Sequence, residues 1–256
     1  MSDVLVREQR GAVLVARLNR PDARNALNGE LMSAIGRAML DAEQDPELRA
    51  VVLTGTGDRA FCAGMDLREF AGGGAPALDT EGGAAFGRFM SGDIAVPVVG
   101  AAQATAVAGG MELLLGCDLV VASSDAKFGL PEVQRGLIPA GGGVLLGARL
   151  PLALALELNL TGEAVSASRA YEMGLINRVV ASDAVLDTAV ELASRVAANG
   201  PLAIRHTKEI VRQSAVDVAG ARTKLNAAIP VIFGSEDARE GATAFVERRE
   251  PRWQGR

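Results

Sequence analysis

The sequence predicts an α/β fold in which strands and helices alternate and wind in a right-handed sense. A pattern of strand, turn, helix and strand recurs several times, which favours parallel strands joined by right-handed crossovers. The 256 residues are 49% hydrophobic, enough to fill one sizeable core. After these repeats the pattern becomes mainly helical, and no linker marks an independent domain.

The N-terminal part predicts a hairpin, a helix and a buried strand. The β-rich runs VLVRE and AVLVARL flank a turn at Gln9, Arg10 and Gly11. Asn28 has the side chain of an N-cap for the helix GELMSAIGRAMLDAEQ, which Asp45 and the following proline end. The run RAVVLTGTG then predicts a short strand leading to a glycine turn.

The middle of the chain predicts two more strands, AVPVVGA and LVVASS. Before them, residues 71–92 are so rich in Gly and Ala that we expect a mobile loop passing into a short helix. After residue 150, the pattern predicts helices at LPLALALELNLTG and SASRAYEMGL, a strand at INRVV, and long amphipathic helices over residues 183–250.

Composition excludes several functional classes. Twenty-six basic and 31 acidic residues give a net charge of −5 without blocks of like charge, which argues against a nucleic-acid partner. The N-terminus MSDVLVREQRG lacks the apolar core of a secretory signal, so we expect a cytoplasmic protein. Prolines, glycines and charges interrupt the longest apolar region, residues 94–122, so we expect no membrane span.

The supply of metal ligands and nucleophiles is equally limited. Cys62 and Cys117 lack the spacing of a metal site and are too few for a disulfide framework, so we expect them to fill core space. His206 is the one histidine, and it lies in a helical pattern among basic neighbours. A histidine-based triad or metal site is therefore unexpected, and the chemistry falls to carboxylates and backbone groups.

Two glutamates stand out as candidates. Glu112 lies in the apolar run AVAGGMELLLGCDLVVA, where an unpaired charge would be costly. Gly109 begins the predicted helix, whose first N–H groups are unpaired and electropositive, and Glu112 lies on the same face one turn later. Glu132 follows Pro131 in the segment GLPEVQRGL. If the site is dry, burial raises the pKa of one acid while hydrogen bonds keep the other ionised, which divides the roles of acid and base.

Simpler interpretations remain open for both acids. Glu112 could cap its own helix, as acids in a first turn often do, and Glu132 could be a surface loop acid. A third motif, RAFCAGMDL, has a small-residue turn in which the amide of Ala63 is expected to point outward. Two amides, from Ala63 and Gly109, would form an oxyanion hole, which suits reactions that build negative charge on a carbonyl oxygen.

Five motifs together resemble the crotonase superfamily, specifically its enoyl-CoA hydratase and isomerase branch. They are LNRPDARNALN, AFCAGMDL, AGGMELLLGCDLVVASSDAKFGLPEVQRGLIPAGGG, LTGEAVSASRAYEMGLINRVV and AFVERREPRW. The resemblance runs essentially end to end, and the order and spacing of the motifs make it specific. It implies a spiral of repeated ββα units over residues 1–195 and a C-terminal helical region, residues 196–256, that assembles homotrimers or hexamers.

The resemblance also implies an activity, the addition of water to a trans-2-enoyl-CoA to give a 3-hydroxyacyl-CoA, as in fatty acid β-oxidation. Ala63 and Gly109 match the oxyanion hole. Glu112 would accept a proton from the attacking water, and Glu132 would deliver one to Cα. The acyl-CoA thioester is the substrate, and neither a cofactor nor a metal is implied. The expected substrate-binding residues are Ala23, Arg24, Ala63, Gly64, Met65, Asp66 and Gly109.

The chain departs from the family pattern at two positions. Many members read NGxAxGGG where this chain reads QATAVAGG, which puts Ala108 immediately before the hole, and Ala140 stands where hydratases often have glycine. Two alternatives stay open. An enoyl-CoA isomerase needs only one proton shuttle, whereas both glutamates are present here; a non-catalytic acyl-CoA binding protein could keep the fold without turnover.

Overall fold

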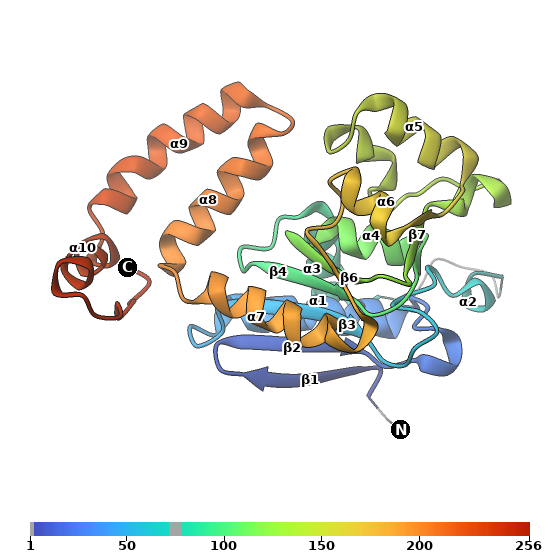
Figure 1. The fold of residues 1–256 in the computed structure, drawn as a ribbon, viewed down its shortest axis with the longest axis horizontal. Coiled ribbons are helices and arrows are strands. Elements are labelled where there is room, and N and C mark those ends of the chain that lie inside the picture. The colour runs from blue at the N-terminus through green and yellow to red at the C-terminus, as the bar shows by residue number, and fades with distance from the viewer. Residues whose placement is uncertain (1–2, 72–77) are drawn as a thin grey trace.

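A computed structural model of the chain describes residues 3–71 and 78–256, and its centre is a six-stranded sheet (Figure 1). The strands follow the order β1 (Leu5–Arg10), β2 (Val13–Leu18), β3 (Ala50–Gly55), β4 (Val98–Ala102), β6 (Leu119–Ser123) and β9 (Arg178–Val180). β1 and β2 form an antiparallel hairpin and every later pairing is parallel, as the sequence predicted. The predicted turn is displaced: Gln9 and Arg10 extend β1, and the chain turns at Gly11 with φ +60°.

A second, three-stranded sheet lies beside the first. It consists of β5 (Ala106–Val107), β7 (Lys127–Gly129) and β8 (Val165–Ser166). The segment 103–108 leaves the end of β4, pairs with β7 through β5, and then enters helix α4 (Gly109–Gly116). This detour places the start of α4 at the junction of the two sheets.

Helices cover both faces of the large sheet. Helix α7 (Val185–Ala197) packs on one face through alternate strand residues such as Val13 and Val52. Helix α1 (Gly29–Gln44) and α4 pack on the other, with Val51 and Leu53 among the buried residues. Because both faces are buried there, the inner strands β3, β4 and β6 are nearly continuous apolar runs, whereas the edge strand β1 is mostly exposed. Asn28 caps α1 as predicted, accepting a 3.0 Å hydrogen bond from Leu31 N.

Glycine allows α1 and helix α3 (Thr80–Ser91) to approach closely. A Cβ at Gly36 would lie 1.8 Å from the carbonyl oxygen of Gly82. The short helix predicted within residues 71–92 is therefore present as α3, whereas the predicted mobile loop falls largely on residues 72–77, outside the described residues. The remaining short helices of the N-terminal half are α2 (Leu67–Ala71) and the 3-10 helix η1 (Pro21–Ala23).

The C-terminal half adds helices around and beyond the sheets. They are η2 (Pro131–Arg135), η3 (Gly143–Ala148), α5 (Leu152–Thr161), α6 (Ala167–Glu172), η4 (Ser182–Ala184), α8 (Pro201–Ser214), α9 (Val218–Phe233) and α10 (Glu236–Glu247). Figure 1 shows α8 and α9 as a helical hairpin that extends away from the sheet, with α10 following α9 at the open end of the hairpin, opposite the α8–α9 loop. Trp253 ties the chain end to the core by donating from Nε1 to the carbonyl oxygen of Ala198 at 2.8 Å.

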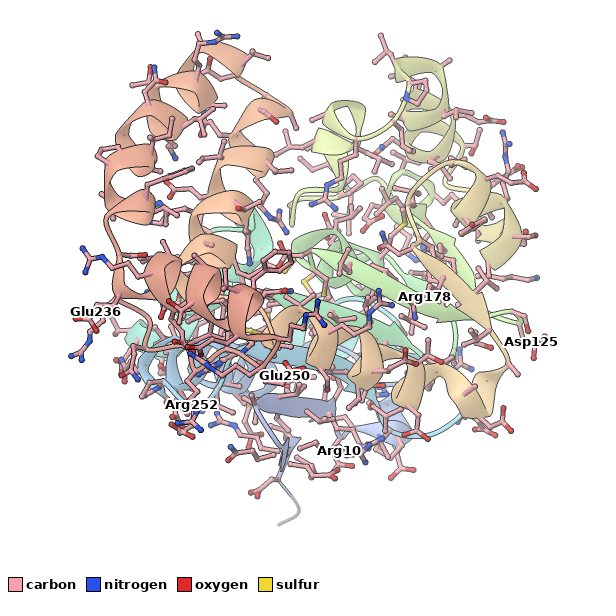
Figure 2. The ribbon with its side chains drawn as sticks, turned by 60° about the vertical axis from the view of Figure 1, so that its left-hand side comes forward. Arg10, Asp125, Arg178, Glu236, Glu250 and Arg252 are labelled. Atoms are coloured by element: carbon pink, nitrogen blue, oxygen red, sulfur yellow. The ribbon has the colours of Figure 1, made fainter. Side chains whose placement is uncertain are left out.

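Charged side chains occur on both the core and the C-terminal segment. Figure 2 labels Glu236, Glu250 and Arg252 from the C-terminal segment and Arg10, Asp125 and Arg178 from the core. Acids and bases are mixed on both parts, in keeping with the absence of charge blocks in the sequence.

Candidate active site

The start of α4 is pressed against the turn that follows β3. A Cβ at Gly110 would lie 2.1 Å from the carbonyl oxygen of Cys62, so only glycine fits there. The preceding residue, Ala108, has φ +53°, a backbone conformation that glycine adopts more easily. Gly109 is the first residue of the helix, and its N–H has no intrahelical acceptor.

The turn itself is held by a second segment of chain. Leu27 N donates to Gly64 O and Asp66 N donates to Leu27 O, both at 2.8 Å. The carboxylate of Asp66 also pairs with Arg20 at 2.8 Å, and hydrogen bonding to that guanidinium lowers the pKa of Asp66. The predicted substrate-binding residues at 23–24 and 63–66 are thus brought together on two paired segments.

The structure corrects the expected position of one amide. Ala63 N–H donates to Arg24 O at 3.1 Å, so it is already bonded and does not point outward. Met65 N instead lies 3.6 Å from the point where a Cβ of Gly109 would be. Among the backbone hydrogen bonds of the described residues, neither the Met65 amide nor the Gly109 amide is a donor. Two unpaired N–H groups from distant segments therefore lie beside each other.

Glu112 is buried one turn into α4, with 5% of its surface exposed. Its Oε1 accepts a 2.9 Å hydrogen bond from Gly143 N, at the start of η3. A Cβ at Gly141 would lie 2.7 Å from Oε2, so glycine is required there to make room for the carboxyl. Burial raises the pKa of Glu112, while hydrogen bonds from the Gly143 and Gly141 amides oppose the rise.

Glu132 lies in η2, directly after Pro131, and is half-buried. Its Oε2 is shielded from solvent and has no hydrogen-bond partner within the described chain. Burial raises the pKa of Glu132, opposed by its own backbone amide and by Arg135. An unpartnered, desolvated oxygen of this kind is best suited to the neutral, protonated form of the acid.

The two carboxyls are close enough to influence each other, because the charge of Glu132 further raises the pKa of Glu112. The expected division, one pKa raised and the other held low, is not what the structure contains: both are raised. Two such acids share one proton over the pH range between their ionisations. The pair can therefore both accept and deliver a proton.

Other side chains can supply neither a metal site nor a thiolate. Within residues 3–71 and 78–256, no group of three or more His, Cys, Asp and Glu side chains is placed to hold a metal ion. Burial raises the pKa of the Cys62 and Cys117 thiols to about 12. In the same part of the chain, no helix is both long enough and apolar enough to cross a membrane.

The sequence analysis did not identify two asparagines whose side chains hydrogen-bond to backbone segments next to the candidate site. Asn25 is fully buried and donates from Nδ2 to the carbonyl oxygens of Thr56 and Ala60, each at 3.0 Å. Asn159, in α5, donates to the carbonyl oxygen of Gly143 at 3.2 Å. A polar residue inside an apolar helical pattern was the available signal for Asn159, since LALALELNLT is otherwise almost entirely apolar.

The chain is similar to known proteins over its full length. A family model described as enoyl-CoA hydratase/isomerase matches residues 8–256. A carnitinyl-CoA dehydratase from Proteus mirabilis is 39% identical over 262 residues, covering 100% of both chains.

Solved structures agree with the sequence matches. An enoyl-CoA hydratase from Mycobacterium tuberculosis H37Rv has a TM-score of 0.91 at 41% identity, and a carnitinyl-CoA hydratase from Mycobacterium avium has a TM-score of 0.77 at 40% identity; each match covers 100% of both chains. The predicted crotonase-like fold is confirmed by this similarity. The protein with the paired amides and paired carboxyls described above belongs to the enoyl-CoA hydratase/isomerase family.

Proposed function

We propose that this protein adds water to the double bond of a trans-2-enoyl-CoA thioester to give a 3-hydroxyacyl-CoA. One observation carries the proposal: two unpaired amides, at Met65 and Gly109, lie at the N-terminus of the helix that presents Glu112, which in turn interacts with Glu132. Relatives named as hydratases and dehydratases of CoA thioesters support it.

The amides polarise the substrate. The thioester oxygen accepts hydrogen bonds from Met65 N–H and Gly109 N–H, which draws electrons from the double bond and makes Cβ electrophilic. As water attacks, negative charge collects on that oxygen as an enolate, where the two donors and the positive end of the α4 dipole stabilise it. Each such donor contributes on the order of 3 kcal/mol to the transition state in well-studied enzymes.

The carboxyls move the protons. Glu112, whose carboxylate accepts the Gly143 amide, takes a proton from the attacking water. Glu132, whose unpartnered oxygen favours the neutral acid, delivers a proton to Cα. The CoA portion lies along the paired segments at Ala23, Arg24 and residues 63–66, so that CoA is a part of the substrate and no separate cofactor is needed.

Hydration of crotonyl-CoA and longer enoyl-CoA esters tests the proposal through loss of the conjugated enoyl-thioester absorbance. Glu112→Gln and Glu132→Gln should each lower the rate at least about 100-fold, the lower range for general acid–base catalysis, with acyl-CoA binding little altered. Gain of that absorbance from a 3-enoyl-CoA without addition of water would identify an isomerase instead. Equal rates for all three proteins would favour an acyl-CoA binding protein.

We further propose that the protein works as a homotrimer or hexamer. Large apolar side chains are exposed on the C-terminal helices, among them Phe233 at 79% and Phe245 at 85%. Monomeric proteins seldom expose contiguous apolar patches of this kind, so a second copy of the chain is the occupant we expect.

A further inference from the structure

A cavity of about 580 Å³ reaches Gly141, which lies beside the Glu112 carboxyl, although Glu112 itself is not among the residues that line the cavity. Gly141 and Met90 both line it. A Cβ at Gly141 would lie 2.7 Å from Glu112 Oε2 and 2.9 Å from Met90 Cε, so the Glu112 carboxyl and the cavity wall at Met90 both lie next to residue 141. The volume is in the ordinary range for a small-molecule site.

The wall of this cavity is unusually basic. Segments from η3, α8 and α9 contribute its charges, near the gap between α8–α9 and the core in Figure 1. Its basic side chains are Arg149, Arg205, Lys208, Arg212 and Lys224, and its acidic ones are Asp93 and Glu209. No aromatic side chain belongs to the described lining.

Some of these charges are balanced. Lys208 and Arg212 both pair with Asp118, at 2.7 and 2.9 Å, and Lys224 pairs with Glu209 at 2.7 Å.

Arg149 and Arg205 are different, because neither forms an ion pair among the residues that the structure describes. Arg149 donates only to the carbonyl oxygen of Leu115. Both arginine side chains are exposed, so their guanidinium groups are free to bind an anion that enters the cavity.

We propose that the cavity receives the far end of the acyl chain, and that Arg149 and Arg205 bind a carboxylate carried there. The enzyme would thereby select enoyl-CoA thioesters whose acyl chain ends in a carboxylate. This inference rests on the proposed hydration at Glu112 and Glu132 and adds a substrate class to it.

The geometry of α4 fits such a chain. Arg212 donates to the carbonyl oxygens of Gly116 and Cys117 at 3.0 and 3.1 Å, which fixes the basic group at the C-terminal end of the helix. Glu112 lies four residues earlier, about 6 Å along the axis at 1.5 Å per residue. Several chain carbons beyond Cβ are therefore needed to reach the arginines.

Other chain ends fit this wall less well. A terminal methyl group would remove water from the guanidinium groups without pairing them. A quaternary ammonium group would meet like charge, and it would lack the aromatic faces that usually bind such cations.

The test compares esters that differ only at the far end. We expect the kcat/KM for hydration of trans-2-octenedioyl-CoA to exceed that of trans-2-octenoyl-CoA at least about tenfold, the size of one hydrogen bond to a charged group. An eight-carbon enoyl-CoA ending in trimethylammonium should be slower than either. The double variant Arg149→Gln/Arg205→Gln should bring the carboxylate-to-methyl ratio close to one.

Arg222→Gln is the matched control, because Arg222 is an exposed residue of α9 that does not line the cavity. It should leave both rates and their ratio as in the wild type. A wild-type ratio of one or below would overturn the inference while leaving hydration intact. Free suberate provides a second check. If it alters hydration of the methyl-ended ester but does not compete with the carboxylate-ended ester, the arginines bind a free anion and not the end of the acyl chain, and the inference is overturned.

Calorimetric binding separates this inference from the proposed function. Saturated octanedioyl-CoA and octanoyl-CoA cannot be hydrated, yet the first should bind at least about tenfold more tightly to the wild type and equally to the double variant. Failure to hydrate any enoyl-CoA would contradict the proposed function. Equal binding of the two saturated esters to the wild type would contradict the selection of carboxylate-ended acyl chains.

Discussion

Ala108 keeps a glycine-like backbone conformation at the entrance to α4. Its φ of +53° and ψ of −133° place an L-residue where Cβ is crowded. Strain of this kind is typically about 1–3 kcal/mol and persists where the surroundings enforce it. This strain lies in the peptide units next to the Gly109 amide. The methyl group of Ala108 therefore affects the geometry of the candidate site.

Ala108→Gly should therefore stabilise the protein. Relief of strain outweighs the added freedom of the unfolded chain, for a net gain of about 1 kcal/mol or a rise of about 2–4 °C in Tm. Thermal unfolding measures it. Ala181→Gly is the control, since Ala181 is exposed with an ordinary φ of −62°, and this change should lower Tm. A lower Tm for Ala108→Gly would contradict the account.

Asn159 is a positioning residue whose effect reaches Glu112 through Gly143. Its Nδ2 holds the Gly143 carbonyl, the Gly143 amide holds Glu112 Oε1, and that amide opposes the raised pKa of Glu112. Asn159→Leu releases the peptide, so the pKa of Glu112 should rise further and a smaller fraction of the base is ionised at a given pH. The acid limb of the kcat/KM profile should move to higher pH, with activity recovering as the pH is raised.

A matched change separates positioning from general destabilisation. Gln134 donates a similar amide hydrogen bond, 3.0 Å to the carbonyl oxygen of Thr161, two residues beyond Asn159 at the C-terminal end of α5. Gln134→Leu should reduce stability without moving the acid limb. If the two variants have the same pH profile, Asn159 has only a structural role.

Residue types were easier to predict than the direction of a backbone group. Glu112 and Glu132 could be singled out because acids in apolar surroundings need a reason to be there. The free amide was expected at Ala63 and is found at Met65, because a sequence shows which residues form a turn but not which N–H is used by pairing. The Ala63–Arg24 hydrogen bond joins segments 39 residues apart and depends on how residues 20–27 fold back.

At the scale of elements, helices with caps and the strands of the large sheet were predictable, including the three-residue strand β9 within INRVV, whereas the short strands of the second sheet were not. The helix after Asn28 was predicted at its observed bounds, Gly29–Gln44, because a cap and an apolar face specify it locally. β5, β7 and β8 have two or three residues each, too few for a period to show. Tertiary contact places them, and with them the start of α4.

Helix α8 is fastened to the core by one carboxylate. Asp118 accepts hydrogen bonds from Val98 N at 2.8 Å and pairs with Lys208 and Arg212, and the paired side chains are only 10–24% exposed. Its position between two cations makes it a connection between the sheet and the C-terminal helices.

Asp118→Asn should destabilise the protein by about 3 kcal/mol, because removing one partner leaves buried charges uncompensated. Urea unfolding monitored by circular dichroism measures the loss. As the control, Asp187→Asn alters an acid that is 84% exposed and pairs with Arg10 at 3.4 Å, and it should cost less than about 1 kcal/mol. Equal stability of the two variants would show that the Asp118 cluster contributes little.

For the whole molecule, the exposed apolar residues on α9 and α10 are the main unexplained feature of a single chain. Phe245→Asp should weaken the proposed assembly by placing a charge where a second copy would bury it. Light scattering after gel filtration should find the wild type at three or six times the 26.4 kDa chain mass and the variant at lower mass. Lys127→Asp is the control, because Lys127 is the exposed residue of strand β7. A wild-type protein at single-chain mass would contradict the proposal.

The length of helix α4 bears on the proposed substrate. Its eight residues form a rod of about 12 Å, and in the proposed reaction the carbonyl lies at its N-terminal end and the basic side chains at its C-terminal end. Inserting one residue would rotate everything beyond it by about 100°, so its length cannot be adjusted in small steps. Variants that prefer longer or shorter substrates are therefore expected to change η3 and α8, while the rod itself stays the same length.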